Sequence, residues 1–304
     1  MPAPSWTSWW GTCVGEPLRI WKYHGTGNDF VMLEDLDDER RLSAELVAAL
    51  CDRRFGVGAD GVIRVTRGRA PDEDFSMDYR NADGSLAEMC GNGIRCLGKL
   101  VLEHELTDAT ELRVGTRGGV KHLTLDVESG VVRSVTVGMG APAFERARIP
   151  MVGPADEPFL RQPFESDGRT FTASAVSMGN PHLVLLLEES PAALDVPKVG
   201  SRIEHDARFP EKTNVEFVAL DGDELEARVW ERGSGETMAC GTGACAALVA
   251  ANEAGLVPAR ATVRFPGGSL LVERTDDDVL LTGPAERVFT ATLEPAWLEA
   301  RGLR

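Results

Sequence analysis

One short motif occurs twice in this sequence, about half a chain apart. Residues 88–96 read EMCGNGIRC and residues 238–245 read MACGTGAC, so each copy contains Cys-Gly-polar-Gly and continues into a segment with helical character. The motif cysteines, Cys90 and Cys240, are separated by 150 positions in a chain of 304 residues. A repeat of this span predicts two domains with the same architecture. It therefore restricts the possible folds far more than the length of the chain does.

Further landmarks recur in the same order in both halves. Asn28 and Asn180 each follow a glycine and precede an apolar segment. Asn81 and Glu231 each lie nine positions before the motif cysteine of their own half. We therefore predict an α+β fold with two pseudo-twofold-related, similar domains, each of which places one cysteine at the start of a helix.

The composition argues against several kinds of partner. A net charge of −16 disfavours a nucleic acid or an anionic membrane surface, because both require basic patches. No apolar run approaches the ~20 residues that a membrane-spanning helix needs. Residues 1–18 lack the basic and apolar regions of a signal peptide, so we expect a cytoplasmic protein. We expect these residues, which include three tryptophans, to be a disordered extension or the product of an upstream start codon; a partner-docking tail is the alternative.

The cysteine pattern favours neither a disulfide framework nor a metal site. The chain has six cysteines, but it contains no C-x-x-C pair and no His pair at ligand spacing. We therefore expect no metal, and the missing C-x-x-C also counts against a thiol–disulfide redox protein. Cys51, Cys96 and Cys245 are predicted to be small buried apolar residues.

A cysteine at a helix start has distinctive chemistry. Unpaired N–H groups and the helix dipole give that position a partial positive charge, which favours thiolate over thiol and binds anions such as carboxylates. We therefore expect the thiol pKa to fall below its usual value of about 8.5. The glycines of both motifs let a ligand approach the backbone.

Two such helices that point at each other would place one thiol on each side of a single carbon. One thiolate could remove the α-proton of a bound amino acid while the other thiol delivers a proton to the opposite face. This inverts the stereocentre, and we expect it to need no cofactor. Either motif alone would be interpreted as a buried structural cysteine in a Gly-rich turn; their duplication favours chemistry.

The sequence closely resembles the diaminopimelate epimerase family from about residue 19 to residue 293. The stretches that carry the resemblance are HGTGNDF at 24–30, NADGS at 81–85, MCGNGIRC at 89–96, GNPH at 179–182, FPEKTN at 209–214 and WERGSGETMACGTGAC at 230–245. The resemblance implies a pyridoxal-independent isomerase that interconverts LL- and meso-2,6-diaminopimelate, for lysine and peptidoglycan precursors. It also implies a homodimer, and in each domain a mixed barrel-like sheet around a central helix, with the active site in the cleft between the domains. On this basis the expected domains are 19–134 plus 286–304, with the C-terminal strand returning to the first domain, and 135–285.

The resemblance also implies a role for individual residues. Cys90 and Cys240 match the acid/base thiols, and His182 and Glu231 match positions thought to tune their pKa. The implied substrate-binding residues are Asn28, Asn81, Gly91, Asn92, Asn180, Asn214, Glu231, Arg232, Gly241 and Thr242. Taken singly, these residues have other interpretations: Asn28 and Asn180 as left-handed turn residues, Glu231 and Arg232 as a surface pair, His182 as a buried histidine with satisfied hydrogen bonds.

Two positions depart from the family. Many members carry Gln where this chain has Gly61, and some carry a dimer-contact Tyr near Leu280. A proline racemase-like enzyme remains an alternative, although it has no need for Glu231 and Arg232 to bind a distal amino-acid group. A non-catalytic small-molecule binding module on the same fold is a second alternative, but it would not need two thiols.

Overall fold

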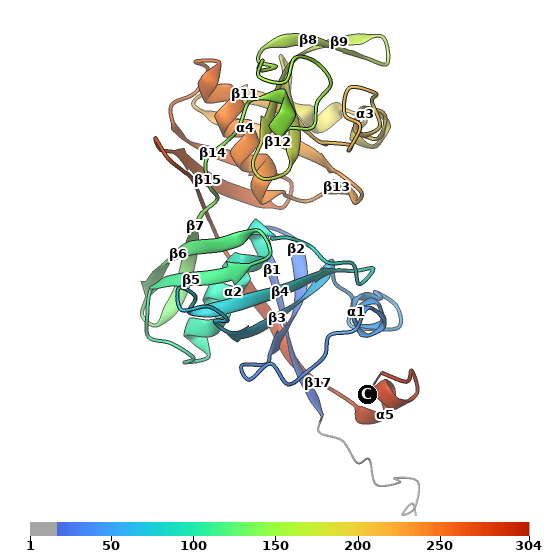
Figure 1. The fold of residues 1–304 in the computed structure, drawn as a ribbon, viewed down its shortest axis with the longest axis vertical. Helices are drawn as coiled ribbons and strands as arrows, with labels where there is room; N and C mark the ends of the chain where they lie inside the picture. Colours follow the sequence, from blue (N-terminus) through green and yellow to red (C-terminus); the bar gives the residue numbers. More distant parts are fainter. Residues whose placement is uncertain (1–16, 304) are drawn as a thin grey trace, which may run out of the picture.

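The computed structural model describes residues 17–303. The extension predicted at 1–18 therefore lies almost wholly outside the described residues, and Leu18 is already the first residue of strand β1. Figure 1 shows two halves stacked along the long axis, the first coloured blue to green and the second green to orange. No helix within residues 17–303 is long and apolar enough to cross a membrane.

The first half consists of strands around one long helix, with a shorter helix outside. Its elements are β1 (Leu18–Gly25), β2 (Asn28–Glu34), α1 (Ala44–Cys51), β3 (Gly61–Arg67), β4 (Phe75–Asn81), α2 (Gly91–Glu103), β5 (Glu111–Thr116), β6 (Gly119–Glu128) and β7 (Val131–Gly138). Ser43 caps α1 by accepting a hydrogen bond from the Leu46 N–H, and Val47 and Leu50 face the core.

The second half repeats this order. Its elements are β8 (Gln162–Ser166), β9 (Arg169–Ser177), β10 (Pro181–Leu187), α3 (Val196–Glu204), β11 (Asn214–Asp221), β12 (Glu224–Glu231), β13 (Gly235–Thr237), α4 (Gly241–Glu253), β14 (Arg260–Phe265), β15 (Gly268–Arg274) and β16 (Val279–Gly283). Short 3₁₀ turns lie at Arg146–Arg148 and Pro191–Ala193. The chain then continues through β17 (Glu286–Leu293) to α5 (Pro295–Glu299).

Strand pairing confirms two similar domains with mixed sheets. In the first half, β1 pairs antiparallel with β2, β2 parallel with β3, β3 antiparallel with β4 and β4 parallel with β5. In the second half, β9, β10, β11, β12 and β14 pair in the same directions. The registers agree as well, since Phe30 is opposite Gly61 and His182 is opposite Asn214.

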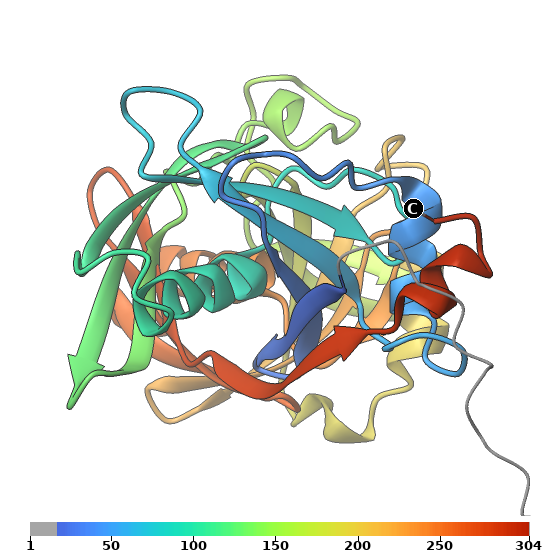
Figure 2. The ribbon, with the colours of Figure 1, turned by 90° about the horizontal axis from the view of Figure 1, so that it is seen from below.

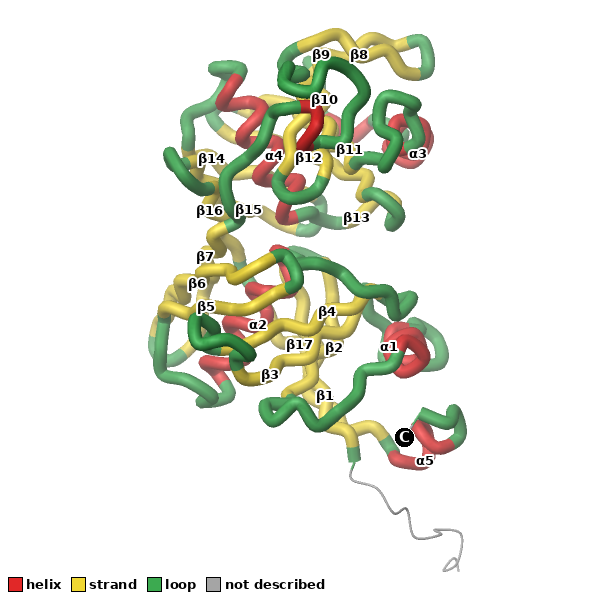
Figure 3. The backbone as a smooth tube through the Cα atoms, in the orientation of Figure 1, coloured by secondary structure: helices red, strands yellow, loops and turns green. Residues whose placement is uncertain are grey.

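Each half encloses its long helix. Residues 91–101 of α2 and nearly all of α4 are buried, and strands of the same half pack around each helix. Figure 2 shows α2 surrounded by the strands of its domain, and Figure 3 shows both long helices inside their strands. Cys96 and Cys245 lie within these helices and are fully buried, and Cys51 is a buried residue at the end of α1, which confirms their predicted role in the core.

The halves are joined through their last strands. β7 pairs antiparallel with β16, and the hydroxyl oxygens of Thr136 and Thr282 are 2.8 Å apart at the centre of this pairing. β17 then returns to the first half and pairs antiparallel with β1, as expected from the family resemblance. The boundary expected between residues 134 and 135 falls inside β7, which pairs with β6 and with β16. The exact division into domains stays a prediction.

Candidate functional site: two helix starts in contact

The N-termini of α2 and α4 meet at the junction between the halves. Cys90 is the N-cap of α2 and Cys240 is the N-cap of α4, both with extended backbone. An added Cβ atom on Gly241 would lie 3.3 Å from the Gly91 Cα, so the first turns touch through their glycines. The predicted placement of one cysteine at each helix start is therefore what the structure has, and both thiols are free.

On the Cys90 side, an asparagine pair surrounds the thiol. Cys90 Sγ lies 3.5 Å from the Asn28 Oδ1, which also accepts a hydrogen bond of 3.3 Å from the Asn92 Nδ2. The Asn28 Nδ2 donates to the Asp60 carboxylate at 2.7 Å, so Asp60 orients the amide with its oxygen toward the thiol. Asn92 also donates to the carbonyl of Ala239 at 3.1 Å, which links the two halves directly.

The Cys240 side has an equivalent arrangement. Cys240 Sγ accepts a hydrogen bond from the Gly243 N–H at 3.4 Å and lies 3.4 Å from the Thr242 Oγ1. The Asn180 Nδ2 donates to the same hydroxyl at 3.3 Å. Neither Asn28 nor Asn180 has a positive φ, so the interpretation of these residues as left-handed turn residues is wrong.

Ionisable groups gather behind Cys240. His182 and Glu216 are both fully buried, and the His182 Nδ1 lies 2.7 Å from the Glu216 Oε1. The other ring nitrogen, Nε2, lies 2.9 Å from the Asn180 Oδ1. Glu231 accepts a hydrogen bond from the Thr237 hydroxyl, and burial raises the pKa of the Glu231 carboxyl.

Burial governs the acidity of both thiols in the empty site. It raises the pKa of Cys90 to about 11, although the backbone N–H groups of Gly93 and Asn92 act in the opposite direction. Burial and the carboxylates of Glu231 and Glu216 raise the pKa of Cys240 well above its ordinary value. The expected lowering by the helix start is therefore wrong here, because desolvation of a thiolate outweighs a few N–H groups. A bound ligand that supplies positive charge would reverse this balance.

The remaining predicted residues surround the two thiols less directly. The buried Asn214 donates from its Nδ2 to the Pro181 carbonyl at 2.7 Å and accepts from the Arg232 N–H at 2.9 Å. The Arg232 guanidinium is exposed and donates to the Glu211 carbonyl at 3.2 Å. Asn81 ends β4 and donates to the Ser85 hydroxyl at 3.0 Å, without a hydrogen bond to the other site residues.

Gly61 begins β3 at the position equivalent to Asn214. It pairs with Asn81 across β3 and β4. An added Cβ atom would lie 2.5 Å from the Arg80 carbonyl and 2.6 Å from the Tyr79 ring, so the strand has no room for a side chain here. Glycine in place of the family's glutamine at position 61 thus allows the Tyr79 ring to pack against the strand.

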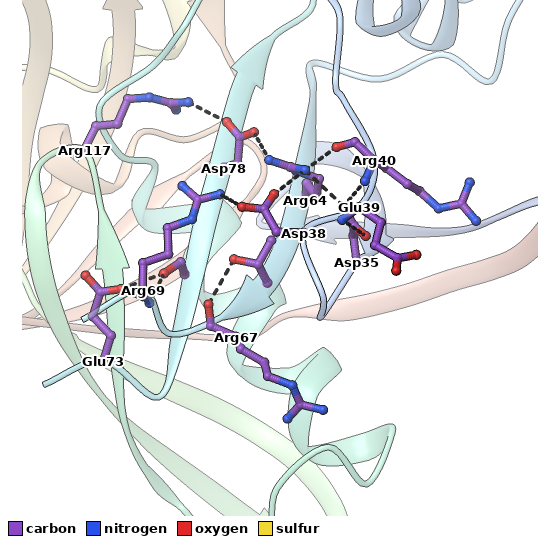
Figure 4. Close-up of polar contacts among 12 residues, drawn as sticks. Asp35, Asp38, Glu39, Arg40, Arg64, Arg67, Arg69, Glu73, Asp78 and Arg117 are labelled. Carbon is purple, nitrogen blue, oxygen red and sulfur yellow. Dashed lines mark hydrogen bonds and ion pairs between the residues drawn. The ribbon is translucent and has the colours of Figure 1, made fainter. Parts of the chain in front are cut away.

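A charged network supports the loop that leads to Cys90. Asp78 is buried between Arg64, at 3.1 Å, and Arg117, at 2.5 Å (Figure 4). Arg117 also donates to the carbonyls of Tyr79 and Ala87, at 3.0 and 3.3 Å, and so ties the start and end of the loop together. Arg64 continues the network to Asp35 and Asp38, and Arg69 also pairs with Asp38.

Other features of the molecule do not belong to this site. A hollow of about 820 Å³ lies between α1 and α5, far from either thiol in the fold, and none of the predicted site residues lines it. Within residues 17–303, no group of three or more His, Cys, Asp or Glu side chains is arranged to hold a metal ion.

Two residues of the site, Glu216 and Asp60, are not predicted by any motif of the sequence. Glu216 stands in the strand segment Val-Glu-Phe, where alternation would place it on one face with no indication that this face is buried. The position of Asp60 in the glycine-rich segment 56–61 is visible in the sequence, but only the pairing of β2 with β3 places it beside Asn28. Long-range register, which carries this information, is not readable from one sequence.

Fold and site together define a class: a two-domain protein that presents one helix-start thiol from each of two similar halves at a shared junction. Solved structures with this fold include a hydroxyproline epimerase from Agrobacterium vitis with bound trans-4-OH-L-proline (TM-score 0.66, 14% identity, 91% of this chain and 92% of that chain). A predicted epimerase from Pseudomonas aeruginosa gives a TM-score of 0.64 at 18% identity, over 91% of this chain and 99% of that one. At such identities the likeness concerns the fold alone.

Sequence comparison identifies the particular family. The family model described as diaminopimelate epimerase matches residues 20–145 and 174–288. A diaminopimelate epimerase of Moorella thermoacetica is 46% identical over 278 residues, 90% of this chain and 98% of its own. One of Leptospira biflexa is 42% identical over 282 residues, 91% of this chain and 99% of its own. The chain therefore belongs to the diaminopimelate epimerase family, as its motifs predict.

Proposed function

We propose that this protein is an isomerase that interconverts LL- and meso-2,6-diaminopimelate without a cofactor. The observation that carries the proposal is the contact between two helix starts, each capped by a free cysteine. The names of the relatives supply the substrate, and the pairing of thiols supplies the reaction type.

The substrate carboxylate would bind to the N–H groups at the two helix starts. These groups and the two helix dipoles favour the negative charge that develops on the carboxylate when the α-proton leaves. Gly91 and Gly241 leave the backbone open to it, and Asn92 and Thr242 follow them in the first turns. The distal end of the substrate has a carboxylate and an ammonium group, for which Arg232, Glu231 and the neighbouring asparagines are suitable partners.

Proton transfer then takes place between carbon and sulfur. One thiolate takes the α-proton as the C–H bond breaks, and the electron pair moves into the carboxylate. The opposite thiol gives its proton to the other face of the carbon, which leaves the configuration inverted and the two thiols with exchanged roles. Because burial raises the pKa of both thiols in the empty site, the positive charge of the bound substrate would favour formation of the first thiolate.

A direct test uses LL-diaminopimelate, with L-proline as a control substrate. We expect epimerisation of the first only. In D₂O, product formed in the first turnovers should contain deuterium at the α-carbon while unreacted substrate does not, since two different groups remove and supply the proton. Return of the original proton to the product would rule out the two-base reaction.

Removal of either thiol should lower the rate of epimerisation far more than the loss of a buried side chain would. We expect Cys90→Ala and Cys240→Ala to lower kcat by at least ~10³-fold, because each removes an acid or base that no neighbour replaces. Cys51→Ala, at a buried cysteine outside the site, is the matched control and should retain kcat. Turnover near the wild-type value in either site variant would refute the proposal.

We place the enzyme in the cytoplasm, in lysine and peptidoglycan precursor synthesis, as a homodimer with no nucleic-acid or membrane partner. The resemblance to the family and the net charge of −16 support this. Sedimentation of the purified protein tests the dimer.

A further inference from the structure

A continuous chain of polar contacts connects a buried carboxylate to one of the two thiols. It runs from the Glu216 Oε1 to the His182 Nδ1 (2.7 Å), from the His182 Nε2 to the Asn180 Oδ1 (2.9 Å) and from the Asn180 Nδ2 to the Thr242 Oγ1 (3.3 Å). The last contact joins Thr242 to the Cys240 Sγ (3.4 Å). Glu216 and His182 are fully buried, and the second oxygen of Glu216 has no hydrogen-bond partner.

The described part of the first half has no counterpart of this series of polar contacts. Strand register makes Phe30 equivalent to His182, and the position two residues after Gly61, Ile63, equivalent to Glu216. The helix glycines agree: an added Cβ atom on Gly93 would meet the Ile63 Cδ1, whereas on Gly243 it would meet the Glu216 Oε1. The pseudo-twofold fold thus carries an apolar pair behind one thiol and an ionisable pair behind the other.

The carboxylate determines where the imidazole holds its first proton. Burial raises the pKa of the Glu216 carboxyl, and the charge and hydrogen bond of His182 act against that rise. The ionised carboxylate that His182 stabilises only accepts hydrogen bonds, so the His182 Nδ1 donates to it. Nε2 is then the nitrogen that can gain or lose a proton, and it contacts the Asn180 amide on the side of the active site. We propose that Glu216 is a positioning residue that keeps a proton on Nδ1 of His182, and that Asn180 and Thr242 couple the proton on Nε2 to the proton on Cys240.

The hydrogen bonds between His182 and Cys240 can run in either of two directions, and each direction is consistent at every contact. When Nε2 carries a proton, it donates to Asn180, Asn180 donates to Thr242, and the Thr242 hydroxyl donates to a Cys240 thiolate. When Cys240 holds the proton, the thiol donates to Thr242, Thr242 donates to the reoriented Asn180 amide, and this amide donates to an unprotonated Nε2. Both states contain the same number of protons, so the proton that leaves Cys240 is held by His182.

Other charged groups face Cys240 as well. The direction in which the Cys240 pKa changes when Glu216 is removed distinguishes two possible roles of Glu216. Glu231 approaches from β12 and Glu216 from β11, and both disfavour a thiolate by simple repulsion. If Glu216 acted only as a nearby negative charge, its removal would make the Cys240 thiolate easier to form. If it instead stabilises the protonated His182 that accompanies the thiolate, its removal would make the thiolate harder to form.

The experiment measures alkylation of Cys240 by iodoacetamide against pH, in a Cys90→Ala background and with peptide mapping. We expect Glu216→Gln to move the profile to higher pH by about one unit, or roughly tenfold in rate at a fixed pH below the midpoint. The alkylation profile of Cys90, measured in a Cys240→Ala background, should not move. A shift of the Cys240 profile to lower pH, or no shift, would overturn the proposal.

A second measurement needs no change at Glu216, in case that variant does not fold. The ¹⁵N resonances of His182 in the wild-type protein should show a proton on Nδ1 at every pH, and a titration of Nε2 that is lost in Cys240→Ala. Loss of the Nδ1 proton, or an Nε2 titration that persists in the variant, would contradict the inference. The inference rests on the proposed function only in taking Cys240 as an acid/base thiol. Neither measurement uses a substrate, so inactivity toward diaminopimelate would not affect the result.

Discussion

At the scale of single residues, Cys90 and Cys240 occupy equivalent positions but have different surroundings. Cys90 lies beside the oriented amide of Asn28, and Cys240 lies beside a hydroxyl, a backbone N–H and two carboxylates. The two faces of a shared carbon would therefore meet chemically unequal thiols. That inequality suits a substrate whose two forms, LL and meso, are diastereomers and not mirror images.

Restoring the family's glutamine at position 61 should destabilise this protein. The Cβ atom of Gly61→Gln would lie 2.5 Å from the Arg80 carbonyl, and backbone cannot move away as a flexible side chain can. We expect a loss of about 1–3 kcal/mol in the free energy of unfolding and no gain in substrate affinity. Urea unfolding with KM measurements checks this, and Gly168→Asn in an open turn is the control. A variant as stable as wild type, with a lower KM, would show that the strand adapts.

The site residues that the sequence identifies are those within repeated or family-like motifs, such as Cys90 and Asn180. Asp60, just before β3, and Glu216, in β11, contact these residues across distances in sequence that only strand pairing spans. The acidity of the thiols was also mispredicted, because burial is a property of the packed structure. A helix start is visible in sequence, but the amount of water around it is not.

At the scale of elements, the contact between α2 and α4 is the feature on which the geometry of the site depends. A Cβ atom on Gly241 would lie 3.3 Å from the Gly91 Cα and 3.0 Å from the Leu281 Cδ2. We expect Gly241→Ala to separate the helix starts by a few tenths of an ångström and to lower kcat more than it raises KM, because the thiols would no longer face one carbon.

Steady-state kinetics and urea unfolding of this variant separate the two effects. Gly255→Asn, at a positive φ with open space beyond the end of α4, is the control and should keep the wild-type kcat. An unchanged kcat in Gly241→Ala would mean that the distance between the helix starts does not limit the reaction.

Elements that directly follow a recognised motif were predictable, namely the helices after both cysteines. β8 was not predicted from the sequence, and the return of the C-terminal strand was predicted only from the family resemblance. β17 is largely exposed, so it lacks the alternation of buried and exposed residues that identifies a strand.

At the scale of the whole molecule, the buried thiols predict a loss of stability in alkali. Burial raises the pKa of Cys51 and of Cys96 to about 12 in the folded state, against about 8.5 for a thiol in the unfolded chain. The folded state thus binds more protons above pH 8.5. The contribution of these thiols is fully present below that pH and is lost as the pH rises toward 12.

Urea unfolding at pH 7.5, 8.5 and 9.5 checks this expectation. The free energy of unfolding should fall by at least about 2 kcal/mol between the last two values, because each of these two thiols contributes about 1 kcal/mol as the unfolded thiol goes from half to mostly ionised. Burial raises the pKa of Cys90, Cys240 and Cys245 as well, so these thiols act in the same direction. Cys51→Ala should be less stable at neutral pH but should lose less on going to pH 9.5. A free energy that is constant or rises over this range would contradict the prediction.

The return of β17 to β1 affects the order in which the chain can fold during synthesis. β1 is made before every other described strand, yet its partner along the sheet edge, Glu286–Leu293, is made after all of them. The half that is begun first is therefore completed last, and until then the edge of β1 is unpaired and open to other strands. A nascent chain that stalls after β16 would have the second half whole and the first half unfinished, so the elongation rate and chaperone access should matter most for the N-terminal half.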